Sequence, residues 1–154
     1  MSQINLIGKF LEPSGKARLA EYLRKQQMVA QNKSVAEGLA KYADVRELSA
    51  GETLVAQGDN DSDIYFILEG SLKIIANNQE IAEREAGQHV GEMCLVNPAL
   101  ARSASNVAAK PTVVAKVSEA AFSKIANEHP QLWRAIAIEL TERLDTLQRR
   151  DRTI

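Results

Sequence analysis

Two short segments of the chain, one around Glu92 and one around Arg102, carry the residue types needed to bind a phosphorylated sugar. Gly91 precedes a predicted short helix, whose first backbone N–H groups and positive dipole end attract anions. Arg102 offers a planar guanidinium that can bind two phosphate oxygens at once, and Ser103 adds a hydroxyl donor. The carboxylate of Glu92 can accept a hydrogen bond from a sugar hydroxyl. Together these groups match a ligand with a phosphate at one end and a ribose hydroxyl at the other.

A structural role competes with this hypothesis. Glu92 and Arg102 could form a salt bridge with each other or with neighbouring side chains, and their spacing alone does not decide between the two roles. The sequence has only two histidines, too few for the His-rich metal cluster of a β-roll enzyme. Cys94 lies near a helix start, where a thiol can become nucleophilic, but a buried packing role is commoner for such a cysteine. We therefore expect a protein that is not an enzyme and that has no metal or other cofactor.

The middle of the sequence has the pattern of short strands separated by turns. Glycines stand at positions 51, 58, 70, 87 and 91, between the apolar, β-branched runs 64–68, 71–76 and 113–117. The first run is apolar at nearly every position, so both of its faces should be buried. Asn77 and Asn78 suit a tight hairpin, because asparagine tolerates a positive φ. Many short strands with glycine turns predict a barrel or roll.

Helices are predicted on both sides of the strands. They cover residues 4–11, 15–31, 34–42, 119–128 and 130–150. Ser14 and Ser118 are expected to cap the second and fourth of these helices. Ser34, followed three residues later by Glu37, has the form of a capping box for the third.

The last predicted helix carries a continuous apolar stripe. The stripe consists of Trp133, Ile136, Leu140, Leu144 and Leu147, which recur at intervals of three and four residues. The stripe could pack against the core along its whole length. Because the helix is long for so small a domain, its outer half could equally form a seam with a second subunit, which predicts a homodimer through residues 130–150.

Three motifs resemble the cyclic nucleotide-binding domain family, which includes bacterial catabolite activator proteins, protein kinase regulatory subunits and gated channels. Gly58 and Asp59, followed by residues 65–70 (YFILEG), resemble its strand signature. Residues 91–95 (GEMCL) and 102–105 (RSAS) resemble the opening and the closing run of its phosphate-binding cassette. The resemblance covers about residues 34–150. It implies an α+β fold: an antiparallel β-roll of the double-stranded β-helix or jelly-roll type, flanked by N-terminal helices and a long C-terminal helix.

The resemblance also implies a role for each residue of the cassette. Glu92 would accept a hydrogen bond from the ribose 2′-hydroxyl, while Arg102 would pair with the cyclic phosphate with help from Ser103. Gly91 and the backbone at Met93 and Cys94 would shape the pocket. The implied phosphate and ribose site therefore consists of Gly91, Glu92, Met93, Cys94, Arg102 and Ser103.

The base would be contacted from the last helix, by Leu147 and Gln148, if the catabolite activator branch is the right guide. The sequence also departs from the family pattern at three positions. Val90 replaces a frequent aromatic residue, Ala101 a frequent proline, and Asn106 a usual apolar residue. None of these changes removes a charged ligand contact, so they bear on affinity and nucleotide choice more than on binding.

These features predict a non-enzymatic ligand sensor or regulatory subunit that binds cyclic AMP, or alternatively cyclic GMP, and signals to an effector protein that the sequence does not identify. Catabolite activator proteins carry a helix-turn-helix after the long helix, whereas this sequence stops at Ile154. We therefore expect no direct DNA binding. Two alternatives remain open: an assembly module that has lost its ligand, and a truncated part of a transcription regulator.

Composition sets the remaining bounds. The 154 residues suffice for one cyclic nucleotide-binding domain over residues 34–154 with an N-terminal helical extension over residues 1–33. No apolar run is long enough for a membrane helix, the N-terminus lacks a signal-peptide pattern, and a single cysteine forms no internal disulfide, so a cytoplasmic location is predicted. Residues 35–101 carry 12 acidic against 4 basic residues, whereas both flanking parts are basic. This asymmetry fits either solvated faces or basic ends that meet an acidic partner.

Overall fold

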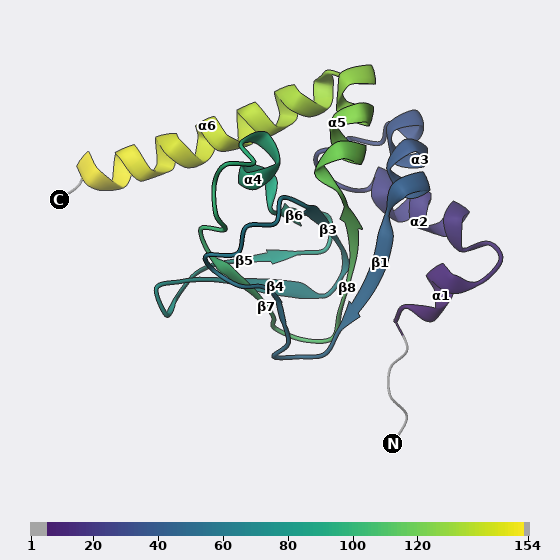
Figure 1. Ribbon diagram of the computed structural model, residues 1–154, viewed down its shortest axis with the longest axis horizontal. Coiled ribbons are helices and arrows are strands. Elements are labelled where there is room, and N and C mark those ends of the chain that lie inside the picture. Colours follow the sequence, from purple (N-terminus) through teal and green to yellow (C-terminus); the bar gives the residue numbers. More distant parts are fainter. Residues whose placement is uncertain (1–5, 153–154) are drawn as a thin grey trace.

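The computed structural model describes residues 6–152, with side chains described up to residue 149, and Figure 1 shows how the elements are arranged. The helices are α1 (Gly8–Leu11), α2 (Gly15–Arg24), α3 (Lys33–Tyr42), α4 (Glu92–Val96), α5 (Glu119–Glu128) and α6 (Gln131–Arg152). The strands are β1 (Asp44–Leu48), β2 (Thr53–Val55), β3 (Ile64–Glu69), β4 (Ser71–Ala76), β5 (Gln79–Glu85), β6 (His89–Val90), β7 (Ser105–Ala108) and β8 (Thr112–Val117).

The strands between residues 44 and 117 form two four-stranded antiparallel sheets. The strand order is β1-β8-β3-β6 in one sheet and β2-β7-β4-β5 in the other. In Figure 1, α2, α3 and α5 stand beside one another at one end of this roll, and α6 runs from α5 across α4. The predicted α+β architecture, a β-roll with N-terminal helices and a long C-terminal helix, is confirmed.

Local sequence explains the strands and turns that frame the roll. Positions 64–68 are all buried, as the unbroken apolar run predicted. Gly70 ends β3 with a φ of +89°, and a Cβ there would lie 2.4 Å from the Thr112 hydroxyl oxygen, so only glycine fits. Asn77 and Asn78 have φ values of 52° and 65° in the β4–β5 hairpin, as expected.

The second predicted helix, 15–31, is wrong in its length, because α2 ends seven residues earlier, at Arg24. The side chain of Gln26 turns into the protein, where Nε2 donates a hydrogen bond of 2.8 Å to the Ile67 carbonyl on β3. Ala30 and Gln31 then adopt positive φ values of 53° and 67°, which a right-handed helix does not allow. The helix ends where the chain makes this long-range contact, and the helical periodicity of the sequence does not reveal such a contact.

The helix caps agree with the prediction at one position and differ at two. Ser118 accepts the predicted capping hydrogen bond at the start of α5. Ser14 makes no side-chain capping bond to α2. Helix α3 begins one residue earlier than expected, at Lys33, and Asn32 caps it by accepting from the Val35 N–H at 3.0 Å. The capping box at Ser34 is therefore wrong, because Asn32 caps the helix two residues upstream.

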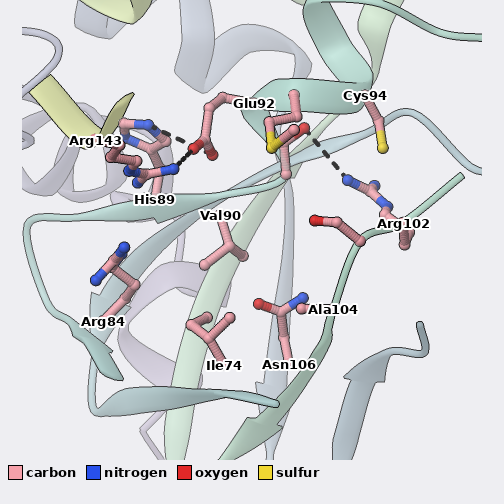
Figure 2. Close-up of a pocket in the computed structure, with 13 residues that line it drawn as sticks. Ile74, Arg84, His89, Val90, Glu92, Cys94, Arg102, Ala104, Asn106 and Arg143 are labelled. Carbon is pink, nitrogen blue, oxygen red and sulfur yellow. Dashed lines mark hydrogen bonds and ion pairs between the residues drawn. The ribbon is translucent and has the colours of Figure 1, made fainter. Parts of the chain in front are cut away.

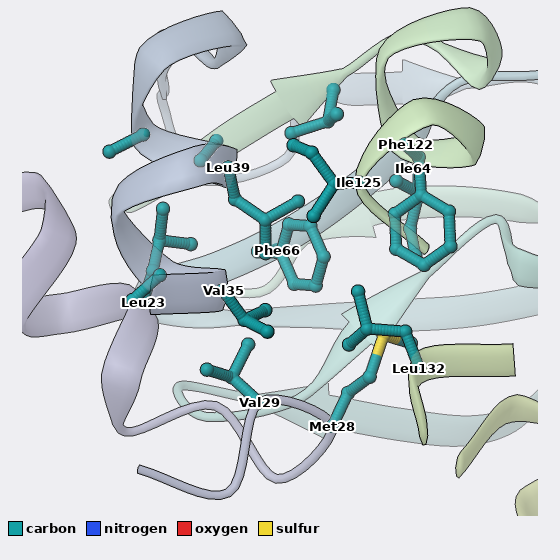
Figure 3. Packing of buried hydrophobic residues seen from close by; sticks show 14 of the residues in the cluster. Leu23, Met28, Val29, Val35, Leu39, Ile64, Phe66, Phe122, Ile125 and Leu132 are labelled. Atoms are coloured by element: carbon teal, nitrogen blue, oxygen red, sulfur yellow. The ribbon is translucent and has the colours of Figure 1, made fainter. Parts of the chain in front are cut away.

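One hydrophobic cluster joins the N-terminal helices to the roll (Figure 3). It includes Leu23 of α2, Phe66 of β3 and Phe122 of α5, each 0% exposed. The boundary predicted at residue 33 stays a prediction, although side chains from both of its sides share this core. Helix α6 enters the cluster only with its first turns: Leu132 is 0% exposed, whereas Leu147 is 56% exposed. The predicted apolar stripe thus divides into a packed inner half and a bare outer half.

Candidate functional site

A small pocket with a cavity volume of about 90 Å³, partly open to solvent, lies between the roll and α6 (Figure 2). Its lining consists of Ile74 on β4, Arg84 on β5, residues 89–94 from β6 and α4, residues 102–104, Asn106 on β7 and Arg143 on α6. Segments that are 70 residues apart in sequence thus share one concave surface.

Gly91 is the tightest point of this lining. It precedes α4 with a φ of +97°. A Cβ at this position would lie 2.6 Å from the Asp63 carbonyl oxygen and 2.7 Å from Nη1 of Arg102. Glycine is therefore required both by the backbone conformation and by the close approach of the guanidinium.

Arg102 is held rigidly at one end of the pocket, with its side chain only 3% exposed. Nε donates to Oδ1 of Asp61 at 3.1 Å, and Nη2 donates to Oδ2 of Asp61 at 2.5 Å and to the Asp63 carbonyl at 2.6 Å. Nη1 donates to the Gly91 carbonyl at 3.3 Å. Most of the N–H donors of the Arg102 guanidinium are thus already bonded to other described residues.

The Arg102–Asp61 pair is fully charged near neutral pH. Burial by itself would lower the pKa of Arg102, but the hydrogen bonds and the negative charge of Asp61 outweigh burial and raise it. The same hydrogen bonds hold the pKa of Asp61 below its usual value, even though burial works against this. An anion that approaches Arg102 must therefore compete with a carboxylate that is already in place.

Glu92 lies at the other end of the pocket and is 3% exposed. Arg143 of α6 donates to Glu92 and also to Glu139, one turn earlier on the same helix. Nε2 of His89 lies 2.8 Å from a Glu139 carboxylate oxygen and 3.8 Å from one of Glu92. Burial would raise the pKa of Glu139, but its contacts with His89 and Arg143 outweigh burial and lower it. This network ties α4 to α6 (Figure 2).

The same network contains a potential metal site. His89, Glu92 and Glu139 are the one group of described residues whose ligand atoms lie close enough together, within 4.8 Å, to hold a metal ion. However, Arg143 already donates to both carboxylates, so a guanidinium supplies the positive charge there. The geometry therefore favours an ion-pair network that orients Glu92, rather than a metal centre.

The structure brings the predicted phosphate and ribose residues together in the pocket, from Gly91 to Cys94 and at Arg102 and Ser103. Their roles in binding stay predictions. Glu92 and Arg102 do not pair with each other; each pairs with another neighbour, as the structural alternative allowed. The predicted base contacts, Leu147 and Gln148, are exposed on α6 and do not line the pocket.

Sequence reasoning missed several residues that line the pocket. Arg143 could have been found, because it lies one turn before Leu147 on the same helix face. Asn106 was visible as a polar departure from an apolar pattern. Arg84 had no local signal, because only the pairing of strands brings it to the site. Asp61, which contacts Arg102 without lining the pocket, had none either.

Comparison with known proteins agrees with this geometry. The model of the family described as "Cyclic nucleotide-binding domain" matches residues 45–129. The chain is 38% identical to the Pycsar effector protein PaPycTIR from Pseudomonas aeruginosa over 144 residues, which are 94% of this chain and 47% of that protein. The chain therefore spans about half the length of the relatives that it matches.

Solved structures share the fold. The regulatory domain of Toxoplasma gondii PKA, co-crystallised with cAMP, superposes with a TM-score of 0.72 at 18% identity, over 82% of this chain and 50% of that chain. The Thermus thermophilus catabolite activator protein gives a TM-score of 0.69 at 23% identity, over 76% of this chain and 56% of that one. None of the helices between residues 6 and 152 has the length and apolarity that crossing a membrane requires.

Proposed function

Because the chain belongs to the cyclic nucleotide-binding domain family, we propose that it binds a cyclic mononucleotide in the pocket of Figure 2 and acts as a non-enzymatic sensor. The observation that carries this proposal is the placement of Arg102 and Glu92. Both are buried, both line one pocket, and each presents the charge suited to a different part of the ligand. Arg102 receives the cyclic phosphate, and Glu92 receives the ribose 2′-hydroxyl.

Phosphate binding is an exchange of anions at Arg102. The Asp61 side chain is 34% exposed, so its carboxylate can turn toward water when phosphate oxygens take over the guanidinium. The buried cation keeps an anionic partner throughout, which avoids the cost of an unpaired buried charge. Ser103, at the exposed rim of the pocket, adds a hydroxyl donor.

The output of the sensor passes through α6. Arg143 forms an ion pair with Glu92, so a ribose hydroxyl that binds Glu92 competes with α6 for the same carboxylate. The ligand orders the cassette of residues 91–103 and repositions the helix that begins after Pro130. This mechanism requires that the ligand prefer one helix position to the other.

The name of one relative supports a signalling role for the proposed sensor. The name of the Pseudomonas aeruginosa relative describes an effector protein, and this chain matches about half of it. We accordingly infer that the domain passes the presence of a cyclic nucleotide to an effector activity. The alternative is an assembly module that keeps the fold without a ligand. Stabilisation against heat separates the two, because a ligand at a hundredfold excess over its dissociation constant adds about 2.7 kcal/mol to a sensor.

Three further predictions from the sequence belong to this proposal. The absence of catalysis, a homodimer through residues 130–150 and a cytoplasmic location all stay predictions. The exposed Leu144 and Leu147 on the outer half of α6 support the predicted dimer seam. Analytical ultracentrifugation of the wild type and of a Leu147→Glu variant tests it, with loss of the dimer as the expected result.

The decisive test of binding is Arg102→Ala. A charge-assisted hydrogen bond contributes about 1.5–3 kcal/mol, and each 1.4 kcal/mol changes a dissociation constant about tenfold. We expect at least a tenfold loss of affinity for cyclic nucleotides, measured by calorimetry on folded protein. Arg149→Ala is the matched control, because Arg149 is 75% exposed and lies outside the pocket. Unchanged affinity in Arg102→Ala would refute the assignment.

The choice of nucleotide needs separate evidence. Cyclic AMP, with cyclic GMP as the alternative, was predicted from the family resemblance. Glu92 and Arg102 contact only ribose and phosphate in the proposed pose, so they do not distinguish among bases. Calorimetry should therefore include the 3′,5′-cyclic forms of adenosine, guanosine, cytidine and uridine.

A further inference from the structure

Two polar side chains in the pocket have no part in holding the phosphate or the ribose. Arg84 on β5 and Asn106 on β7 line the pocket with Ile74 between their strands. In Figure 2 these three residues lie along the side of the pocket across from Glu92. A nucleotide held by Arg102 and Glu92 would leave this side for its base.

The Asn106 amide is free to bind a ligand. Asn106 is 6% exposed, and no hydrogen bond joins its amide to another described residue. Its amide atoms are not among the fully buried polar atoms that lack a partner, so they keep contact with the open pocket that Asn106 lines. An amide in this position can both donate a hydrogen bond to a ligand and accept one from it. On β4 its register partner is Ile74, whose apolar side chain offers no donor or acceptor.

Arg84 is similar. Among the described residues its guanidinium has no ion pair, and its one hydrogen bond is a long one of 3.4 Å to the neighbouring Glu83 carbonyl. Burial and the positive charge of Arg143 lower the pKa of Arg84 and outweigh the negative charges of Glu92 and Glu139, which raise it. A half-buried guanidinium with no carboxylate at ion-pair distance is suited to an acceptor that arrives with a ligand.

We propose that Arg84 and Asn106 recognise the base, and that the pocket prefers a base with a ring carbonyl oxygen (guanine, cytosine or uracil) to adenine. This inference rests on the proposed function of the same pocket. The chemical reason is that a guanidinium only donates hydrogen bonds. A carbonyl oxygen accepts them, whereas adenine has no carbonyl group and offers a guanidinium only its ring nitrogens as acceptors, beside an exocyclic amine that donates. The Asn106 amide, which both donates and accepts hydrogen bonds, pairs with the polar atoms of the base that Arg84 leaves free.

Calorimetry with the cyclic forms of adenosine, guanosine, cytidine and uridine tests the proposal on the wild type, Arg84→Met and Asn106→Val. We expect the wild type to bind at least one carbonyl-bearing nucleotide about tenfold more tightly than cyclic AMP, as loss of a charge-assisted hydrogen bond implies. Each variant should reduce that preference, because it lowers the affinity for the carbonyl-bearing nucleotide more than the affinity for cyclic AMP. Glu83→Gln, an exposed neighbour on the same strand, is the matched control.

The outcomes separate this inference from the proposed function. Tightest binding of cyclic AMP by the wild type, or an unchanged preference in both variants, overturns base recognition but leaves nucleotide binding intact. Equal weakening of all four nucleotides by Arg84→Met also overturns it, because that result assigns Arg84 to the phosphate. No binding of any of the four by the wild type overturns both. Circular dichroism of each variant verifies that a loss of affinity does not come from misfolding. The two substitutions lie on different strands, so each tests base recognition separately.

Discussion

Arg102 and Glu92 lie at two ends of one pocket, but their partners come from different parts of the molecule. Arg102 is held by Asp61 and by two backbone carbonyls, all on the roll side of the site. Glu92 is held by Arg143, which comes from α6. Ligand binding at the first end exchanges one local anion for another, whereas binding at the second end acts on a helix. If the chain binds a nucleotide as proposed, this difference predicts that affinity depends mainly on Arg102 and signal transmission on Glu92.

The largest expected effect comes from Gly91, which joins the two ends. Gly91→Ala places a side chain at a positive φ and within 2.6 Å of a carbonyl oxygen, so we expect a loss of about 3 kcal/mol of unfolding free energy. Binding should fall at both ends, because Arg102 and α4 must both shift. Urea unfolding and calorimetry measure the two effects.

Gly51 provides a matched control for that experiment. It has a φ of +85°, but a Cβ there would meet nothing within 4 Å. Gly51→Ala should therefore lower the free energy of unfolding by only about 1 kcal/mol, the cost of placing alanine at a positive φ, and should leave the affinity for the nucleotide unchanged. Equal losses in the two variants would contradict the argument that close contacts at Gly91 shape the pocket.

A change confined to the Glu92 end should have an intermediate effect. Arg143→Met removes the guanidinium that ties Glu92 to α6 while keeping most of the side-chain volume. We expect the ligand to change hydrogen-exchange protection over residues 131–149 less than in the wild type. The difference should correspond to about 1 kcal/mol of coupling free energy between the ligand and α6. Hydrogen exchange with and without a saturating cyclic nucleotide measures this change.

The wild type itself can refute the idea of transmission through α6. Identical exchange protection over α6 with and without ligand would mean that the helix takes no part. Arg149→Ala is again the control, because its ion pair with Asp145 is exposed and lies within one helix.

The smallest effect is expected at the Arg102 end, from Asp61→Asn. This variant removes the carboxylate that competes with phosphate, so we expect affinity to rise about threefold, in the range measured for partly exposed ion pairs. Calorimetry at neutral pH measures the change. A fall in affinity would show that Asp61 positions Arg102 and does not compete with the ligand.

The pH dependence of stability tests the same pair. The folded-state pKa of Asp61 is lowered from the usual 3.8, so the pair stabilises the fold above that value. The stabilisation is lost as the pH falls below about 3.8 and through the lower folded-state pKa. Asp61→Asn should therefore flatten the wild-type decline in stability below about pH 4, as followed by urea unfolding.

Much of the fold could be predicted because its signals are local. An unbroken apolar run marks β3, two asparagines mark the β4–β5 hairpin, and Ser118 marks the start of α5. These features act within a few residues, through backbone conformation or a single capping bond. The end of α2 could not be predicted, because Gln26 bonds to a strand about 40 residues away.

For the site, the sequence by itself determined which residues form the cassette: a glycine, a carboxylate and an arginine. It did so through the resemblance of three motifs to a known family, because the spacing of Glu92 and Arg102 alone left a structural salt bridge open. Only the tertiary structure decided what surrounds them. Asp61 meets Arg102 and Arg143 meets Glu92 across about 40 and 50 residues of chain, through the course of the segment between β2 and β3 and the path of α6. The partners that we propose for competition, transmission and base choice are thus set by packing between distant segments, which carries no local pattern.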